Sequence, residues 1–525
     1  MHPLRVLMPF LIAVAAHGLE SPLAESKELY REPFRPQFHF SPAKNWMNDP
    51  NGLVYFDGQY HLFFQYNPYG DTWGHMSWGH ATSTDLLHWS ELPVAIPEDG
   101  DAMIFSGSVV VDESNSSGFG KAGQAPLVSI YTGAGRAVGS TQNQNLAFSL
   151  DAGRSWRKYA GNPVLDIHSS AFRDPKVFRY EPGHTWVMAV ALSDRHEVAF
   201  YSSPDLKSWT HLSDFGPAGA SDGAWECPDL FPLPIDGNPD NMRWVLKVDV
   251  FRSAIAAGSG TQYFVGRFDG REFKPDADPG QPATVATPHW LDYGMDFYAA
   301  MSWGNLPSAN RRTVWIAWMN SHHYAQEIPT SPWRGAMSVP RELSLHSSAG
   351  SLRLRQAPVR ELLSLRGRQW QIQPRTIGAL PYRVNLPKGT GKSMEIIVAI
   401  APRSAREVGI DVRVGAGEKT RIGYDRAGEL LFIDRSHSGL IPSPEFAHRS
   451  SMPLKAHDGV IILHILLDWS SVEVFANDGE GVMTEQLFAA PDSVGIELSA
   501  NDGTAQLSSM NLWELRSAVP RHAHH

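Results

Sequence analysis

Three short motifs in the first half of the chain each place a carboxylic acid close to a proline and within three residues of an aromatic residue. They are Trp46-Met47-Asn48-Asp49-Pro50-Asn51-Gly52, Phe172-Arg173-Asp174-Pro175 and Trp225-Glu226-Cys227-Pro228-Asp229. A residue before proline is pushed toward extended backbone, so Asp49 and Asp174 are predicted to lie on stiff, strand-like chain. Acids in apolar, rigid surroundings are costly unless they are paired or used. The motifs therefore predict a carboxylate active site rather than a solvated acidic face.

Carboxylic acids grouped in this way are suited to cleaving a glycosidic bond. Glycoside hydrolysis requires two acids that flank the bond, one ionised and one protonated at the working pH. Burial and the proximity of like charges push the pKa values of neighbouring acids apart. The separations along the chain do not prevent Asp49, Asp174 and Glu226 from converging in one pocket. Each acid alone could cap a turn or form a buried salt bridge, but the set of three favours chemistry.

The composition is that of a well-packed globular protein with more than one domain. The 525 residues exceed what one hydrophobic core usually holds, and 42% of them are hydrophobic. The formal net charge is −10 and no long basic run occurs, which disfavours nucleic acid and anionic membranes as partners and favours a neutral substrate. The 17 tryptophans would suit sugar binding, although most are expected to pack in the core.

The first residues have the pattern of a secretory signal, which we place at residues 1–18. Arg5 supplies a positive charge, and residues 7–16 form an apolar run that ends in small residues. This run is too short to span a membrane, and no other segment could do so. We therefore expect a protein secreted to the periplasm or the extracellular space. Cys227 is the single cysteine of the sequence, which excludes an intrachain disulfide, and we expect a small buried residue rather than a nucleophile.

The elements that must position the acids are β-strands, and the chain is predicted to be all-β. Short runs rich in β-branched and aromatic residues are bounded by turn residues, and long helical periodicity is nearly absent. A motif in which an aspartate precedes an aromatic residue by four or five positions recurs at 85–89, 151–156, 205–209 and 269–273. Such a repeat is typical of propeller blades, with the motif in an outer hairpin. Together with a strand-rich unit at 297–345, it predicts a five-bladed β-propeller at residues 34–350.

The pattern changes after residue 350. Residues 351–366 are predicted to be a linker, with a short helix at 358–365. Strands then resume without the aspartate motif, which predicts an antiparallel β-sandwich at residues 367–517. We expect this domain to support the propeller. Apart from Asp49, Asp174 and Glu226, two further acids lie near aromatic residues. Asp296 is expected to be structural, and Asp229 is expected to lie in a turn or at a strand end.

Taken in order, these motifs resemble those of glycoside hydrolase family 32, which contains invertases, inulinases and levanases. The resemblance covers nearly the whole chain after the signal. Beside the three acidic motifs it rests on Phe38-His39-Phe40-Ser41-Pro42, Trp73-Gly74-His75-Met76-Ser77-Trp78-Gly79-His80, Phe105-Ser106-Gly107-Ser108, Ser331-Pro332-Trp333-Arg334 and residues 470–479. The resemblance implies a five-bladed propeller followed by a β-sandwich, in agreement with the interpretation of the strand pattern.

The resemblance also implies roles for individual residues. Asp49 matches a nucleophile that attacks the anomeric carbon of fructose, Glu226 matches an acid and base catalyst, and Asp174 matches an acid that binds fructosyl hydroxyls and stabilises the transition state. Further contacts to the substrate are expected from Trp46, Met47, Asn48, Gln65, Trp73, Phe105, Ser106, Arg173 and Trp333. The mechanism would retain the anomeric configuration, which requires the carboxyl groups of Asp49 and Glu226 to lie roughly 5–5.5 Å apart. The implied chemistry needs neither a cofactor nor a metal, and the sequence has no phosphate loop and no zinc-binding spacing of Cys and His.

Among fructosides, terminal β-D-fructofuranosyl residues of levan or inulin fit this sequence best, with sucrose as a lesser substrate. Asp49 and an intact loop at Trp73 resemble the enzymes that act from a chain end, and residues 225–234 and 262–266 resemble bacterial levanases and exo-inulinases. The alternatives are a sucrose-specific invertase, a fructosyltransferase and a sugar-binding propeller without activity. A five-bladed arabinan-degrading enzyme also uses three acids, but it should lack the first and third motifs.

Overall fold

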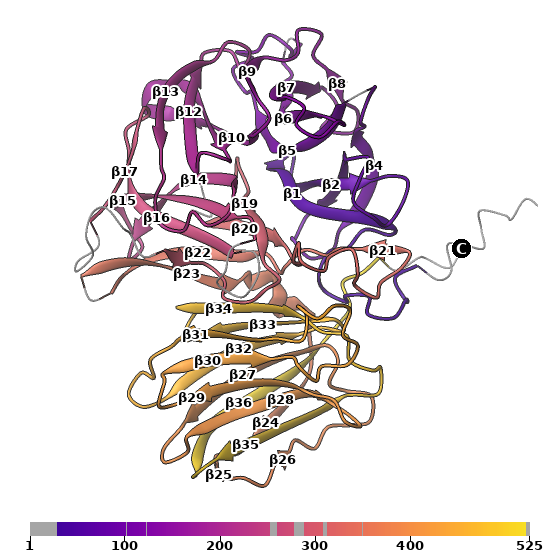
Figure 1. The fold of residues 1–525 in the computed structure, drawn as a ribbon, viewed down its shortest axis with the longest axis vertical. Helices are drawn as coiled ribbons and strands as arrows, with labels where there is room; N and C mark the ends of the chain where they lie inside the picture. The colour runs from indigo at the N-terminus through magenta and orange to yellow at the C-terminus, as the bar shows by residue number, and fades with distance from the viewer. Residues whose placement is uncertain are drawn as a thin grey trace, which may run out of the picture.

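The strands of this protein form a ring of blades that rests on a two-layered sandwich (Figure 1). The computed structural model describes residues 29–100, 102–121, 123–252, 260–277, 288–307, 312–348 and 350–520. The predicted signal at 1–18 lies outside these residues. Each helix in the described ranges is too short or too polar to cross a membrane.

In the described part of the chain, strands β1 to β23 build the five predicted blades. The first blade contains β1 (Asn45–Phe56), β2 (Gln59–Asn67), β3 (Ser77–Ser83) and β4 (Ser90–Ile96). The second contains β5 (Ala102–Val111), β6 (Leu127–Gly135), β7 (Gln142–Ser149), β8 (Arg157–Lys158) and β9 (Leu165–Ser169). The third contains β10 (Phe172–Tyr180), the 3₁₀ turn η1 (Glu181–Gly183), β11 (Thr185–Leu192), β12 (Glu197–Ser203) and β13 (Thr210–Phe215).

The fourth and fifth blades share one continuous sheet. The fourth contains β14 (Trp225–Ile235), β15 (Asn238–Val250), β16 (Gly260–Phe268), β17 (Phe273–Pro275) and β18 (His289–Trp290). The fifth contains β19 (Tyr298–Ser302), β20 (Thr313–Trp318), β22 (Arg341–Ser348) and β23 (Ser351–Pro358). The two blades join through β14 and β22 at the outside of the ring, where Ile235 pairs with Leu345.

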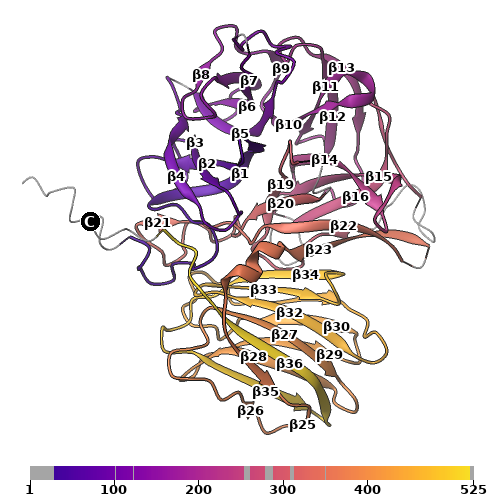
Figure 2. The same ribbon diagram turned by 180° about the vertical axis from the view of Figure 1, so that it is seen from behind.

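The ring closes by strand pairing between its last blade and its first. The short strand β21 (Trp333–Arg334), which follows β20, pairs in parallel with the start of β1. Val54 of β1 also bridges to Gly304 just after β19. The innermost strands β1, β5, β10, β14 and β19 contact one another in turn around the axis. Figure 2 shows the same ring from behind, with the first blade next to β21. This closure fixes the innermost strands relative to each other, and these strands carry the acids.

The repeated aspartate motif forms the predicted outer hairpin, between the third and fourth strands of four blades. In each copy the aspartate carboxylate accepts backbone N–H bonds from residues two to four positions further on. The residue after each aspartate has a positive φ: Leu86, Ala152, Leu206 and Gly270. In three copies the tryptophan indole then donates to the carbonyl three residues before it. The motif is therefore one turn used four times.

The second domain is a sandwich of two antiparallel sheets, as predicted. One sheet contains β24 (Arg366–Ile372), β25 (Arg375–Ile377), β36 (Ala505–Leu515), β27 (Met394–Ala401), β32 (Ile461–Leu467), β33 (Ser471–Ala476) and β34 (Gly481–Gln486). The other contains β26 (Tyr382–Arg383), β35 (Gly495–Asn501), β28 (Glu407–Val414), β29 (Thr420–Asp425), β30 (Leu430–Asp434) and β31 (Arg449–Pro453). Aliphatic side chains of both sheets fill the space between them. The predicted linker at 351–366 is only partly correct, because residues 351–358 form β23, which pairs with β22 of the fifth blade. The 3₁₀ helix η3 (Arg360–Leu365) leads from there into β24.

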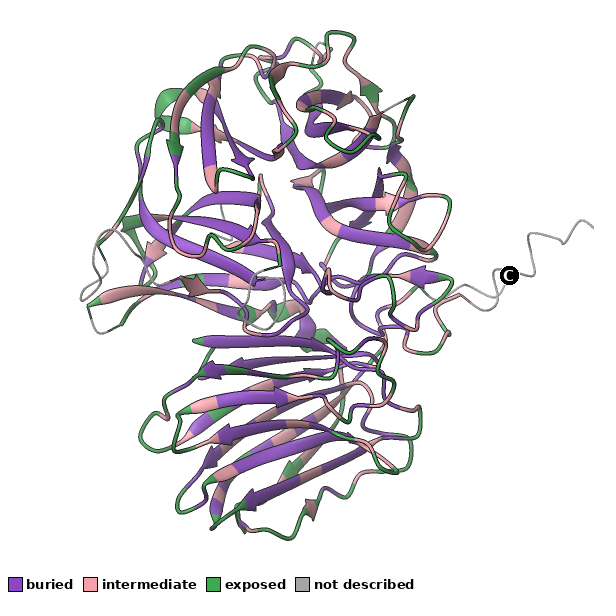
Figure 3. Cartoon of the chain, in the orientation of Figure 1, coloured by how far each residue is buried: buried purple, intermediate pink, exposed green. Residues whose placement is uncertain are grey.

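The two domains share a buried interface. One apolar cluster contains propeller residues such as Phe38 and Tyr298, the η3 residues Leu362 and Leu365, and sandwich residues such as Phe475. In Figure 3 the sandwich strands β33 and β34 at this junction are coloured as buried, and exposed residues lie mainly in the outer loops. The sandwich therefore covers an apolar flank of the propeller.

Buried charges cross this interface as well. His39 lies between Asp468 and Glu473, with its ring nitrogens 2.7 and 2.8 Å from their carboxylate oxygens. Burial alone would lower the pKa of His39, but the two carboxylates raise it to about 9. Arg341 of the propeller donates to Glu473 and to Asp292. Charges without water are tolerated only when each is paired, as these are.

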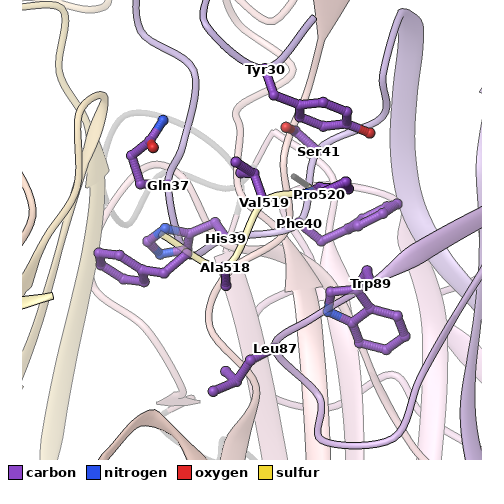
Figure 4. Close-up of a pocket in the computed structure, with 11 residues that line it drawn as sticks. Tyr30, Gln37, His39, Phe40, Ser41, Leu87, Trp89, Ala518, Val519 and Pro520 are labelled. Atoms are coloured by element: carbon purple, nitrogen blue, oxygen red, sulfur yellow. The ribbon is translucent and has the colours of Figure 1, made fainter. Parts of the chain in front are cut away.

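The two ends of the described chain meet beside the first blade. The backbone N–H of Ala518 donates to the carbonyl of Gln37 at 2.8 Å. Figure 4 shows Ala518 to Pro520 against His39 and Phe40, with Trp89 of the first blade nearby. The cavity between them measures about 20 Å³, enough for one water molecule. These contacts fasten the C-terminal segment to the propeller.

Two expectations about single acids have different outcomes. Asp296 is buried and its Oδ2 lies 2.6 Å from Arg435 Nη1 of the sandwich, in agreement with a structural role. Asp229 does not lie in a turn or at a strand end. It is a fully buried residue inside β14, 3.1 Å from Lys176 Nζ, and it accepts a bond from the Ser302 N–H. Its position in the strand reflects this buried ion pair between the third and fourth blades.

Candidate active site

The candidate site is built from irregularities at one level of the five innermost strands. The register of each strand against its neighbour shifts between Met47 and Pro50, Ile104 and Gly107, Arg173 and Lys176, Glu226 and Asp229, and Tyr298 and Met301. A β-bulge bends the strand and re-aims its side chains. Three of these bulges contain a proline, which has no N–H to give to the ladder. The bulges turn side chains of successive blades toward the axis of the ring.

The backbone is strained at three of these bulges, at Asp174, Cys227 and Ala299. Asp174 has a φ of +65° and Cys227 a φ of +46°, so Asp174 is not on extended chain as its place before a proline predicted. A left-handed conformation in a residue other than glycine is costly and concentrates at functional sites. Here it is supported by the Asp174 N–H bond to Thr132 Oγ1 at 3.0 Å and by the Lys247 Nζ bond to the Cys227 carbonyl at 2.7 Å.

Asp49 is held by two donors. Asn48 Nδ2 donates to its Oδ1 at 3.0 Å, and Ser106 Oγ of the second blade donates to its Oδ2 at 2.6 Å. Trp46 Nε1 in turn donates to Asn48 Oδ1 at 2.7 Å, which fixes the orientation of the Asn48 amide. These bonds fix the carboxylate of Asp49.

Cys227 joins Asp49 to Asp174. Its backbone N–H donates to Asp174 Oδ2 at 3.1 Å, and its thiol lies 3.6 Å from Asp174 Oδ2 and 3.8 Å from Asp49 Oδ2. Burial and the two carboxylates raise the pKa of the thiol well above its usual value. The thiol is therefore neutral, and Cys227 is a small buried residue as expected, with the added contact to both acids.

Glu226 is held from two sides. Arg173 donates to its Oε1 through Nε at 3.0 Å and Nη2 at 2.8 Å, and Tyr298 Oη donates to its Oε2 at 2.5 Å. Arg173 Nε also lies 3.9 Å from Asp174 Oδ2. The three acids thus form one chain of contacts, in which Cys227 links Asp49 to Asp174 and Arg173 links Asp174 to Glu226.

The electrostatics of the cluster separate two of the acids. Burial raises the pKa of Asp174, and Glu226 and Asp49 add to this against Arg173, to a value of about 7. Burial would also raise the pKa of Glu226, but Arg173, His322 and the Tyr298 hydrogen bond hold it below its usual range. At neutral pH Asp174 of the free site is therefore about half protonated, while Glu226 is charged.

A cavity of about 300 Å³ opens over the acids, within the size range of small-ligand pockets. Its lining includes all three acids and most of the predicted substrate contacts: Trp46, Asn48, Gln65, Trp73, Phe105, Ser106 and Arg173. Trp73 is 45% exposed and faces Phe105 edge-on at 6.3 Å, so aromatic surface lies open at the pocket. Among the described residues Gln65 Nε2 has no hydrogen-bond partner, which leaves a buried donor available to a ligand.

Met47 and Trp333, which the resemblance also suggested as contacts, do not line this cavity. Side chains alternate between the two faces of a strand, so Met47 points away from Trp46 and lies in the hydrophobic core. Trp333 is 2% exposed, belongs to the closing strand β21, and is covered by the guanidinium of Arg35 at 4.3 Å. Both positions correct the expectation of direct contact and indicate structural support.

Sequence reasoning missed several residues of the site. Phe251, Arg252, His322, Ala325 and Gln326 line the cavity, and Tyr298 contacts Glu226 directly. None of them lies in one of the acidic motifs. His322 packs edge-on against Tyr298 at 4.7 Å and against Phe251 at 4.6 Å. The one available signal in the sequence is the aromatic run around Tyr298, which predicts only a structural role for Asp296.

No group of His, Cys, Asp and Glu among the described residues has the arrangement of a metal site. The acids of the pocket instead contact Arg173 and neutral donors, and Cys227 and Arg173 link them to one another. A carboxylate with two donors, a second carboxyl beside an arginine, and a third that holds a proton can supply nucleophilic and acid–base steps.

Comparison with known proteins identifies the family. The model described as "Glycosyl hydrolases family 32 N-terminal domain" matches residues 39–358, and the model described as "Glycosyl hydrolases family 32 C terminal" matches residues 361–514. A levanase of Bacillus subtilis (strain 168) is 46% identical over 499 residues, which cover 94% of this chain and 72% of the relative. An extracellular exo-inulinase of Aspergillus awamori is 41% identical over 518 residues, which cover 93% of this chain and 96% of the relative.

Solved structures agree. The crystal structure of exo-inulinase from Aspergillus awamori superposes with a TM-score of 0.86 at 40% identity, covering 93% of this chain and 99% of the other. Both family models, which together span most of the chain, and relatives of nearly full coverage lead to the same assignment. The chain belongs to glycosyl hydrolase family 32 and is a β-fructosidase.

Proposed function

We propose that this protein is a secreted, retaining β-fructosidase that releases terminal β-D-fructofuranosyl residues from levan or inulin, and less effectively from sucrose. The observation that carries the proposal is the contact chain from Asp49 through Cys227, Asp174 and Arg173 to Glu226 at the base of a single cavity. Relatives named levanase and exo-inulinase support the substrate class.

The proposed reaction has two steps. Asp49 attacks the anomeric carbon of the fructosyl group while Glu226 gives a proton to the leaving oxygen, so the glycosidic bond breaks and an ester to Asp49 forms. Glu226 then takes a proton from water, which attacks the same carbon and frees Asp49. Asn48 and Ser106 hold Asp49 in place for both steps. Asp174 accepts bonds from fructosyl hydroxyls and stabilises the positive charge of the transition state.

The first step requires a proton on Glu226, whereas the free site holds it on Asp174. Sugar hydroxyls that donate to Asp174 replace that proton by hydrogen bonds, and the substrate excludes water from the pocket. Exclusion of water raises the pKa of a carboxyl group. We infer that substrate binding moves the proton of the cluster from Asp174 to Glu226, and that Arg173, which contacts both, keeps the charge balanced.

Sugar binding over the acids is supported by the lining of the cavity. Trp73 and Phe105 line it together with the three acids and offer aromatic surface on which a sugar face can stack. Secretion is supported by the signal pattern of residues 1–18 and by the relative named as an extracellular exo-inulinase.

The test is product release from inulin, levan and sucrose in parallel, for the wild type and for Glu226→Gln and Asp49→Asn. We expect fructose as the early product from both polymers, and a fall in kcat of roughly 10²–10⁴-fold for Glu226→Gln. The first fructose released should have the β-configuration, as NMR of the fresh product would detect. Asp222→Asn, an acid outside the cavity lining, serves as a matched control and should keep full activity.

Other products would change the assignment. Activity on sucrose alone would make the protein an invertase, and early oligosaccharides would mean a cleft that binds within the chain. Longer fructans formed at high sucrose concentration would mean a fructosyltransferase. An inactive wild type that still binds fructose would leave a sugar-binding propeller.

A further inference from the structure

The segment that leads into Tyr298 is held by the sandwich. Residues 291–297 run along the edge strand β34: the Tyr293 N–H donates to the Val482 carbonyl at 2.9 Å, and the Asp296 N–H donates to the Thr484 carbonyl at 3.2 Å. In return the Thr484 N–H donates to Asp292 Oδ1 at 2.8 Å. Figures 1 and 2 both show β34 directly next to the fifth blade. Tyr298, whose hydroxyl contacts Glu226, is the first residue after this segment.

A second wall of the site, next to Tyr298, is also held by the sandwich. The loop after β20 contributes His322, Ala325 and Gln326 to the cavity. Its first carbonyl, that of Met319, accepts a bond from Gln486 Nε2 of β34 at 3.0 Å. Tyr324 of the same loop is buried and packs edge-on against Phe446 of the sandwich at 5.2 Å.

Arg435, which follows β30 of the sandwich, joins these two walls. Its Nη1 donates to Asp296 Oδ2 at 2.6 Å and its Nη2 to Tyr324 Oη at 2.6 Å, and Tyr324 Oη donates to Asp296 Oδ1 at 2.6 Å. Glu485 Oε2 lies 2.8 Å from Nη1, so the guanidinium meets two carboxylates. The side chain is fully buried. A planar guanidinium can span two partners in this way, whereas an ammonium is a point charge.

We propose that Arg435 is a positioning residue for catalysis, which acts from the sandwich through Asp296 and Tyr324 on Tyr298 and His322. This inference rests on the proposed role of Glu226 as acid and base. Tyr298 and His322 face Glu226 and pack against each other at 4.7 Å, so a shift of either wall changes the surroundings of that carboxyl. Displacements of about 1 Å in a supporting structure can lower a rate roughly 10²-fold. The sandwich is then part of the catalytic architecture and more than a cover for the propeller.

The decisive variants are Tyr324→Phe and Arg435→Lys. Tyr324→Phe removes the bridging hydroxyl and keeps the ring, and Arg435→Lys keeps the positive charge but cannot reach Asp296 and Tyr324 at once. The matched control is Tyr424→Phe, because Tyr424 is an equally buried sandwich tyrosine whose hydroxyl donates to the Leu454 carbonyl away from the pocket. We expect both pocket-linked variants to lower kcat about tenfold, with little change in KM. The alkaline limb of the kcat profile, which reports the proton on Glu226 in the complex with substrate, should move upward, because Tyr298 no longer lowers the pKa of Glu226.

A second readout is independent of activity. The groups that face His322 are Glu226, Asp49, Arg252 and His323, and burial holds the pKa of its imidazole below the usual value. In ¹⁵N-histidine NMR, with the signal assigned by its loss in His322→Gln, Tyr324→Phe should raise this pKa toward the ordinary value and Tyr424→Phe should leave it in place.

The outcomes separate this inference from the proposed function. If the wild type hydrolyses fructosides and Tyr324→Phe equals it in kcat, pH profile and His322 titration, the inference is overturned while the function stands. If the wild type does not hydrolyse any fructoside, the function fails, and the His322 titration alone decides whether Arg435 positions the pocket wall. A fall in thermal stability common to Tyr324→Phe and Tyr424→Phe, without a difference in rate or titration, would reduce Arg435 to a purely structural residue.

Discussion

At the scale of single residues, the chemistry of the site depends on which of Asp49, Asp174 and Glu226 holds a proton. It also depends on how these acids share the positive charge of Arg173. Arg173 contacts Glu226 and approaches Asp174, and Cys227 supplies an N–H and a neutral thiol between Asp174 and Asp49. The three acids were predictable from sequence because each precedes a proline or stands two residues before one, beside an aromatic residue. Their electrostatic differences were not predictable, since these depend on neighbours from other blades.

The raised pKa of Asp174 leads to a prediction for the pH dependence of kcat/KM, which reports the free enzyme. The reaction needs the proton that the cluster holds, and this proton is lost as the pH rises through the Asp174 pKa of about 7. We expect kcat/KM on sucrose or inulin to fall above this pH, approaching tenfold per pH unit. A profile that stays level to pH 9 would contradict the assignment. The comparison is kcat, measured under saturating substrate. Its pH dependence should not show the Asp174 pKa, because sugar hydroxyls replace the proton on Asp174 in the complex.

The substrate contacts show where residue-level prediction fails. Trp46, Asn48 and Asp49 lie in one motif and all reach the pocket, while Met47 between them lies in the core. Strict alternation would send Trp46 and Asn48 to one face and Asp49 to the other, and only the bulge after Met47 lets both Asn48 and Asp49 face the ligand. Tyr298 and His322 were missed because they reach the site from the last blade and its closing loop.

At the scale of elements, the five bulges explain how the site draws side chains from several blades. A regular strand would place alternate side chains against the neighbouring blades. The bulges instead present Ser106, Asp49, Asp174 and Cys227 to a common space from three further strands and β1. The prolines of the three acidic motifs were the sequence signal for these bulges, because a proline inside an inner strand cannot complete the ladder. The repeated outer turn was predictable for a similar reason, since its aspartate and tryptophan bond locally.

A buried histidine pair between the first two blades gives a prediction about acid stability. His61 Nδ1 of β2 lies 3.0 Å from His80 Nε2 of β3, and the ring of His80 stacks on Phe63 at 4.0 Å. The turn glycine Gly153 of the second blade packs close to both rings, because an added Cβ would lie 3.3 Å from His80 and 3.4 Å from His61. Burial lowers the pKa of His61 to about 4 and that of His80 well below its usual value.

Both histidines therefore make stability depend on pH. A base whose folded-state pKa is depressed stabilises the fold above its unfolded pKa, and this contribution is lost as the pH falls through the folded value. We expect the unfolding temperature to drop between about pH 6.5 and 4, with each histidine adding up to about 1.4 kcal/mol per pH unit to the slope. His80→Gln should flatten this drop. His168→Gln, the same change at a side chain that is 88% exposed, should leave the slope as in the wild type, and an equal slope in all three would contradict the prediction.

At the scale of the whole molecule, the two-domain, all-β architecture could be predicted because strands continue after residue 366 without the aspartate motif of the propeller. The dependence of one domain on the other could not. It comes from residues far apart in sequence, such as His39 with Asp468 and Arg341 with Glu473, whose charges balance only in the assembled molecule. Neither strand pattern nor motif carries that pairing, because each partner alone is an ordinary polar residue.

The last prediction concerns a propeller made without its sandwich, by ending the chain after residue 366. Such a chain would expose the apolar residues that now pack on Phe475 and Val482. It would leave Asp296 without Arg435 and Arg341 without Glu473, so that Arg341 keeps only Asp292. Unpaired charges on a large apolar flank favour aggregation, so we expect insoluble protein in a sedimentation assay. Co-expression of residues 367–520 as a separate chain should restore soluble, active enzyme, because the interface forms between side chains and needs no covalent link. A truncated propeller that is soluble and fully active would instead mean that the sandwich neither covers nor positions the catalytic domain, and it would also remove the basis for a role of Arg435.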